Sequence, residues 1–210
     1  MDKIEVRNVG KKFGDQKIVQ NVSFHMESGK IYGLIGRNGS GKTVLMQCIA
    51  GFMKPTTGEI FCNGKQIGKE MKMLERMGFI LNDPGFLMDE SGYRNLRYLA
   101  QIRRIADKKK IRETMVRVGL DPDSKKHVGN YSLGMRQRLA IAQAIMEEPD
   151  ILLLDEPMNA LDEDGVEQMR ELFLQLKGQG KLILMTSHNR EDIDCLCDKV
   201  YQIRKGEWIC

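Results

Sequence analysis

The sequence predicts an α/β protein with a parallel core sheet flanked by helices, an N-terminal antiparallel β subdomain and an inserted α-helical subdomain. Three observations support this class. Short apolar runs bounded by Gly and Asn occupy the first quarter of the chain. Apolar strands then alternate with helical patterns, which is typical of a parallel sheet covered on both faces. Finally, a long stretch with helical spacing separates two of these strands.

Three short strands are predicted in the first quarter, at Ile4–Val9, Val22–Met26 and Glu59–Asn63. Their Gly- and Asn-rich boundaries favour an antiparallel arrangement. A further strand, Lys30–Ile35, runs into a Gly-rich loop and a helix from about Thr43 to Ala50. The first quarter therefore combines an antiparallel sheet with the start of the parallel sheet.

Helices and strands alternate through the rest of the chain. The predicted elements are a strand at Met77–Leu81, a mainly helical stretch from about Tyr93 to Gly119, a helix from about Ser132 to Met146, a strand at Ile151–Leu154, a helix near Val166–Gly178, a strand at Leu182–Thr186, and a closing hairpin of Lys199–Ile203 and Glu207–Ile209. No fixed-period repeat or biased linker interrupts them. We expect one domain over residues 1–210, with the helical subdomain inserted at about 83–147.

Composition excludes several classes of protein. The 210 residues can bury an ordinary core, and no run approaches the ~20 apolar residues that span a bilayer. The N-terminus resembles no secretory signal, so we expect a cytoplasmic protein with reduced cysteines. Its five cysteines lack zinc-type spacing, and a net charge of +4 without an aromatic-basic pattern makes a nucleic-acid partner unexpected.

A Gly-rich segment between a predicted strand and a predicted helix matches the phosphate-loop pattern GxxxxGK[ST]. Its residues are Gly36, Arg37, Asn38, Gly39, Ser40, Gly41, Lys42 and Thr43. Glycines let backbone N–H groups and the positive end of the helix face a polyphosphate. Lys42 is expected to neutralise the β- and γ-phosphates and Thr43 to ligate Mg²⁺. Val44 offers no hydroxyl to the α-phosphate, so its backbone N–H is expected to serve. A chance Gly-rich turn is the alternative.

Two carboxylates, Asp155 and Glu156, end the apolar run Ile151–Leu154. A buried strand delivers such residues at its carboxyl edge, where ligand sites of α/β proteins lie. Asp155 is expected to hold Mg²⁺ through its water shell, and Glu156 to deprotonate an attacking water, a role typically worth about 10²–10⁴ in rate. The alternative is an acidic helix cap after a core strand, which the phosphate loop disfavours.

The order of motifs resembles the ATP-binding-cassette (ABC) ATPases across essentially the whole chain. Tyr131-Ser132-Leu133-Gly134-Met135 is similar to the family signature, and Ser132 precedes Asp155 by 23 positions. The resemblance implies that Ser132 and the Gly134 backbone contact the γ-phosphate bound by the opposite protomer. Leu133 and Met135 depart from the commonest LSGGQ form, which leaves polar contacts from Met135 open. A plain helix N-cap is the alternative for Ser132.

Two further segments follow the family order. Asn159-Ala160-Leu161-Asp162 resembles the loop that couples two ATP sites in a dimer, or else is a turn before a helix. His188 follows a predicted strand, 33 residues after Asp155. It resembles the switch histidine that contacts the γ-phosphate and the attacking water; a structural histidine is the alternative.

Phe13 and Asn82 are weaker matches to the family. Phe13 is at the position of the aromatic residue that stacks on adenine, although core packing competes with that role. Asn82 stands where the family usually has Gln or Glu as a magnesium ligand, and its shorter side chain could bind Mg²⁺ weakly, through water, or not at all.

The resemblance implies an ATP hydrolase that uses ATP and Mg²⁺ to power a membrane-embedded transporter. Its expected partners are a second ABC ATPase subunit, identical or different, and an integral-membrane subunit. Its expected location is the cytoplasmic face of the membrane. The signature and the segment after Asn82 are most similar to bacterial bacitracin-type and lantibiotic-type exporters. The alternatives are a soluble ABC ATPase with a non-membrane partner, and a regulatory cassette that binds ATP without turnover.

Overall fold

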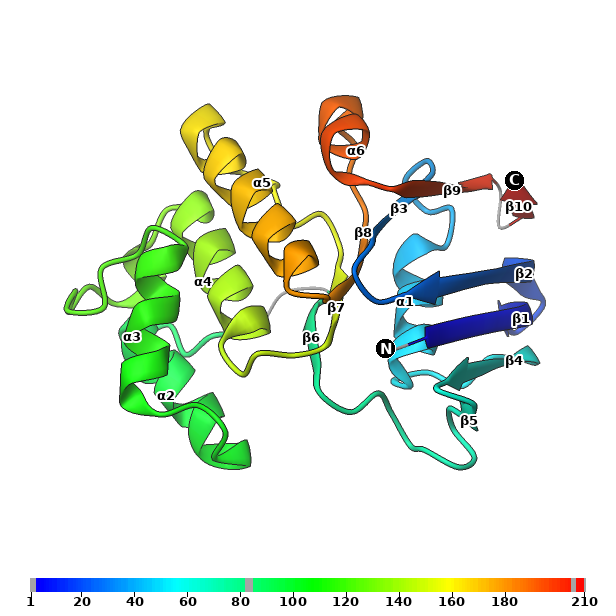
Figure 1. The fold of residues 1–210 in the computed structure, drawn as a ribbon, viewed down its shortest axis with the longest axis horizontal. Helices are drawn as coiled ribbons and strands as arrows, with labels where there is room; N and C mark the ends of the chain where they lie inside the picture. The colour runs from blue at the N-terminus through cyan, green and yellow to red at the C-terminus, as the bar shows by residue number, and fades with distance from the viewer. Residues whose placement is uncertain (1–2, 82–84, 205–206, 210) are drawn as a thin grey trace.

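The computed structural model describes residues 3–81, 85–204 and 207–209. Its strands lie together on one side of the molecule and in its middle, whereas helices α2 to α4 form the opposite side (Figure 1). The strands are β1 (Lys3–Phe13), β2 (Gln16–Glu27), β3 (Ile31–Ile35), β4 (Thr57–Cys62), β5 (Lys65–Gln66), β6 (Met77–Ile80), β7 (Ile151–Leu154), β8 (Leu182–Met185), β9 (Lys199–Arg204) and β10 (Glu207–Ile209). Within the described residues the strand order is β5-β4-β1-β2-β10-β9-β3-β8-β7-β6.

The predicted antiparallel sheet is present in the N-terminal part. Strand β1 pairs antiparallel with β2 and with β4. Both β1 and β2 are longer than predicted, and they extend to Phe13 and Gln16 at the turn that joins them. The sequence signal stops early because the strands' ends are mostly exposed and polar, and because the β1–β2 register shifts near Val9 and Lys11. The alternation of apolar and polar residues that identifies a strand appears in the sequence only where one face of the strand is buried.

The parallel sheet is also as predicted. Strands β6, β7, β8, β3 and β9 pair in parallel in that order. The closing hairpin is confirmed, since β9 and β10 pair antiparallel. The carboxyl ends of the parallel strands therefore lie along one edge, and the segments after β3, β7 and β8 meet there.

Helices surround this sheet. They are α1 (Lys42–Ala50), α2 (Gly92–Arg103), α3 (Lys108–Arg117), α4 (Leu133–Ile145), α5 (Glu163–Gly178) and α6 (Arg190–Leu196), with a short 3-10 turn at Val128–Asn130. The predicted helical stretch is two helices, because Arg104 ends α2 with φ 56° and Asp107 caps α3. Helix α6 was not predicted: four of its seven residues are charged, and its apolar pattern is weak.

Both faces of the parallel sheet are covered, as predicted. Alternate residues of β7 point to opposite sides: Leu152 and Leu154 belong to the core formed with helices α2 to α5, and Ile151 and Leu153 to the core that contains α1. This alternation explains why β7 reads as an unbroken apolar run. It also makes the strand end a rigid platform for Asp155 and Glu156.

Candidate functional site

The Gly-rich loop joins β3 to α1, as the sequence predicts. Gly41 forms the N-cap of α1 with φ 98°, a left-handed conformation that side chains rarely adopt. A Cβ at Gly41 would also lie 2.7 Å from the backbone oxygen of Ile18. Glycine is therefore required twice at this position, by the backbone conformation and by the close approach of β2. The loop N–H groups precede a helix N-terminus, which favours an anion.

The Lys42 ammonium lies inside this loop without a carboxylate partner among the described residues. Its Nζ donates to the backbone oxygens of Gly36 at 2.8 Å and Arg37 at 3.4 Å, and the residue is 7% exposed. A buried cation with only carbonyl acceptors attracts a negatively charged ligand. Ser40 adds a buried hydroxyl oxygen with no hydrogen-bond partner in the described chain. Both observations suit a polyphosphate held by the loop.

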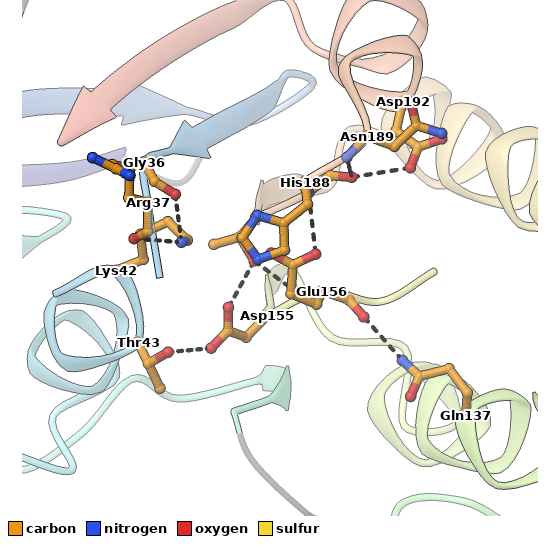
Figure 2. Close-up of polar contacts among 12 residues, drawn as sticks. Gly36, Arg37, Lys42, Thr43, Gln137, Asp155, Glu156, His188, Asn189 and Asp192 are labelled. Carbon is orange, nitrogen blue, oxygen red and sulfur yellow. Dashed lines mark hydrogen bonds and ion pairs between the residues drawn. The ribbon is translucent and has the colours of Figure 1, made fainter. Parts of the chain in front are cut away.

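Asp155 links the loop to two strand ends. Its carboxylate accepts hydrogen bonds from the Thr43 hydroxyl and from Thr186 Oγ1, the latter at 2.6 Å (Figure 2). The Thr186 hydroxyl in turn accepts the backbone N–H of Glu156 at 2.8 Å. A hydroxyl beside a carboxylate is an oxygen pair of the kind that Mg²⁺ binds while keeping several waters. The donor set therefore fits the expected cation.

Glu156 and His188 face each other at the carboxyl edge of the sheet (Figure 2). The His188 backbone N–H donates to Glu156 Oε2 at 3.2 Å, and His188 Nε2 lies 3.1 Å from Oε1. Oε1 is buried without an aligned hydrogen-bond donor among the described residues, so it can accept one. The φ of 50° at Glu156 places it in the left-handed region, which a non-glycine residue adopts at a cost. The geometry suits a base next to an imidazole.

Several residues behind these groups were not predicted. Gln137 on α4 donates to the backbone oxygen of Pro157 at 2.8 Å, beside Glu156. Ser187 Oγ donates to the buried carboxylate of Asp192 at 3.0 Å, and Arg170 on α5 binds the same carboxylate at 2.6 Å and 3.0 Å. These contacts hold the His188 segment to α5. The two longer-range contacts carry no local sequence signal, because Gln137 and Pro157 are 20 residues apart and Arg170 and Asp192 are 22 residues apart.

The signature-like segment opens α4 but lies apart from the loop. Ser132 caps the helix, accepting the Met135 N–H at 3.1 Å. Among the described residues no hydrogen bond or ion pair joins Ser132 to the Gly-rich loop, Asp155 or Glu156. A Cβ at Gly134 would lie 2.8 Å from the Ala160 oxygen, so the start of α4 packs tightly on the segment after β7.

The remaining predicted residues divide into three cases. Phe13 is 49% exposed at the end of β1, so its ring is accessible to a ligand, and Lys11 Nζ lies 5.1 Å from its ring centroid. Val44 is half-buried against the α1 core and Met135 against the helical core. Asn82 lies outside the described residues.

Comparison with known proteins identifies the family. The sequence model of the ABC transporter family matches residues 19–159. The chain belongs to the ABC transporter family. It is 43% identical over 203 residues to the uncharacterised ABC transporter ATP-binding protein YybJ of Bacillus subtilis (strain 168), covering 97% of this chain and 93% of that one. It is 40% identical to the bacitracin transport ATP-binding protein BcrA of Bacillus licheniformis, covering 97% of this chain and 67% of that one.

A solved structure supports the fold of this ABC transporter subunit. An ATP-binding subunit of an ABC transporter superposes with a TM-score of 0.87 at 23% identity, covering 99% of this chain and 88% of that one. The predicted fold class is thereby confirmed. The protein is an ATP-binding and ATP-hydrolysing subunit that powers transport by an ABC transporter. No helix in the described part of the chain is long and apolar enough to cross a bilayer.

Proposed function

We propose that this ABC transporter subunit drives export of a peptide, an antibiotic or another small molecule by a membrane-embedded partner. Its similarity to the bacitracin transport protein BcrA supports this choice over import. In this proposal the chain is peripheral, at the cytoplasmic face of the membrane. It acts as one of two ATPase subunits, whose closure is transmitted to the partner.

The observation that carries the catalytic assignment is the meeting of three segments at one edge of the parallel sheet. Lys42 and Thr43 come from the first turn of α1, Asp155 and Glu156 from the segment directly after β7, and His188 from the segment after β8. Lys42 and the loop N–H groups bind the phosphates. Glu156 accepts a proton from the attacking water, and His188 orients it. Bound Mg²⁺, held by Thr43 and Asp155, would supply charge neutralisation.

Phosphate release by Glu156→Gln tests the assigned base. Glutamine keeps the size of the side chain and removes its basicity, so turnover should fall by about 10²-fold or more. ATP binding should persist, because Glu156 is not part of the phosphate loop. A variant as fast as the unmodified protein would remove Glu156 as the base. Absence of turnover in both would favour the regulatory cassette.

Lys42→Ala tests the phosphate loop independently. The variant leaves polyphosphate charge without its buried cation, and we expect tight ATP binding to be lost. Retention of micromolar affinity in equilibrium titration would contradict the role of Lys42. Arg37→Ala is a suitable control, because the Arg37 side chain is exposed and Lys42 contacts its backbone oxygen, which alanine keeps.

The proposed second subunit explains why the signature lies apart from the loop. We assign Ser132 and the Gly134 backbone to the γ-phosphate held by the opposite subunit, and Phe13 to the adenine of its own. Ser132→Arg should prevent ATP-driven dimer closure while leaving ATP binding to the monomer intact. Size-exclusion chromatography in the presence of ATP measures dimer formation. The protein also carries Glu156→Gln, so that bound ATP is not hydrolysed. Undiminished dimerisation would contradict the assignment.

The partner is tested by purifying tagged protein from detergent-solubilised native membranes and identifying the co-purified proteins. A stoichiometric polytopic protein that is released when the interface is disrupted supports the transporter role, and its cavity then locates the substrate. Recovery only from the aqueous fraction, alone or with ribosomes or DNA, would favour a soluble ABC ATPase.

A further inference from the structure

Helices α2 and α3, on the side of the molecule opposite the antiparallel strands (Figure 1), border a cavity of about 430 Å³. Four basic side chains line it: Arg94 and Arg97 on α2, Arg112 on α3, and Lys125 in the segment that follows α3. His127 is a further lining residue from that segment. The cavity shares no lining residue with the nucleotide loop. The fold therefore gathers basic side chains from three separate parts of the sequence.

Two carboxylates in this cavity are each paired with an arginine. Glu90 accepts hydrogen bonds from Arg94 Nη1 at 2.9 Å and from the Tyr98 hydroxyl at 3.0 Å. The Arg94 hydrogen bond, followed by that of Tyr98, holds the pKa of Glu90 below its usual value. Asp123 binds Arg112 through both carboxylate oxygens, at 2.9 Å and 2.5 Å. Each acid therefore remains charged and matches one arginine.

The other two cations have no such partner. Within the described residues, Arg97 makes no ion pair or hydrogen bond, and its Nε is buried without an acceptor. Its guanidinium carbon lies 5.8 Å from the centroid of the Tyr98 ring. Lys125 likewise has no acidic partner in the described chain, so two of the four cationic charges are left over. Lys125 is exposed, whereas the buried Arg97 Nε without an acceptor is costly and points to a missing ligand.

We propose that this cavity binds a phosphate group carried by a small molecule. The planar guanidinium fork matches phosphate oxygens, and a phosphate monoester carries about −1.5 to −2 charge at pH 7, which cancels the two unmatched cations. The cavity has the volume of a ligand pocket and exceeds a bare phosphate, so it holds part of the attached group as well. Two sources share this chemistry: a free phosphorylated metabolite and the headgroup of an anionic phospholipid.

The free-phosphate arm of the test uses inorganic phosphate and the full chain carrying Lys42→Ala, which disables the nucleotide loop. Ionic strength is held constant with sodium chloride. The Nε–Hε resonance of Arg97 should shift with a saturable dependence on phosphate. Arg97→Gln and, independently, Lys125→Gln should each weaken phosphate binding at least tenfold. Binding to Arg97→Gln is followed on the Arg112 resonance, and binding to Lys125→Gln on the Arg97 resonance. Lys109→Gln is the matched control, because its exposed α3 side chain lies outside the cavity lining.

The phospholipid arm uses sedimentation with vesicles of phosphatidylglycerol in phosphatidylcholine. Saturable phosphate binding without vesicle binding supports a free metabolite. Vesicle binding that is lost in Arg97→Gln and Lys125→Gln but kept in Lys109→Gln supports a headgroup. The proposal is overturned if neither probe binds, or if Lys109→Gln weakens binding as much as the cavity variants do. The nucleotide-site assignments are unaffected by any of these results, since the test protein lacks a functional nucleotide loop.

Discussion

Thr186→Val removes one hydroxyl that joins the two carboxylate residues of the proposed nucleotide site. Thr186 is fully buried, and its Oγ1 donates to Asp155 at 2.6 Å while accepting the Glu156 N–H at 2.8 Å. Valine has nearly the same shape, so no cavity forms. The variant therefore removes the two hydrogen bonds while leaving the packing around residue 186 nearly unchanged.

The magnitude follows from these two bonds. A hydrogen bond to a charged carboxylate is worth about 1.5–3 kcal/mol, and a buried N–H left unpaired costs about 1–3 kcal/mol. Because Asp155 keeps its hydrogen bond with Thr43, we take values near the lower ends, about 3 kcal/mol in total. For a chain of this size, 1 kcal/mol lowers the melting temperature by about 2–4 °C, so we expect a fall of about 6–12 °C.

Urea unfolding followed by circular dichroism measures the change in the free energy of unfolding, and phosphate release measures turnover. Thr186→Ser is the matched control: it keeps the hydroxyl and loses one methyl group, worth about 0.8 kcal/mol. We expect Thr186→Val to be clearly less stable than Thr186→Ser and slower in turnover. If valine is as well tolerated as serine, the hydroxyl does not hold the two carboxylate residues in place.

Three further outcomes are expected. Gly78→Ala on β6 should lower stability by about 1–3 kcal/mol in urea unfolding, because its methyl group would overlap a backbone carbonyl of α4; an unchanged midpoint would contradict this close packing. Asp192→Asn should lower kcat with little change in KM for ATP, because it weakens the Arg170 contact behind the His188 segment; a change in KM alone would contradict a positioning role. Burial raises the pKa of the Cys197 thiol to about 12, so below that pH its alkylation should rise with pH and lag behind that of exposed Cys195. Equal rates for the two thiols at pH 8 would refute this.

Much of the candidate site could be predicted because its residues are adjacent in sequence. The loop from Gly36 to Thr43 is one continuous motif, and Asp155 and Glu156 follow directly on the apolar run of β7. Hydrophobic periodicity and sequence motifs both extend over a few residues, so they can be recognised before the fold is known. Helix α6 was missed for the complementary reason: it is too short and polar to carry a helical period, and its Asn189 cap becomes informative only beside β8.

The sequence by itself determined the fold class and the family resemblance, and it singled out the proposed phosphate loop and carboxylate pair, because local spacing encodes each of these. Only the tertiary structure decided which side chains support them. Thr186 reaches Asp155 across 31 residues, and Arg97, Arg112 and Lys125 share one cavity although they come from three segments. Hydrogen bonds and charge clusters of this kind depend on distances between elements, which are set by sheet pairing and helix packing, and no local pattern records them.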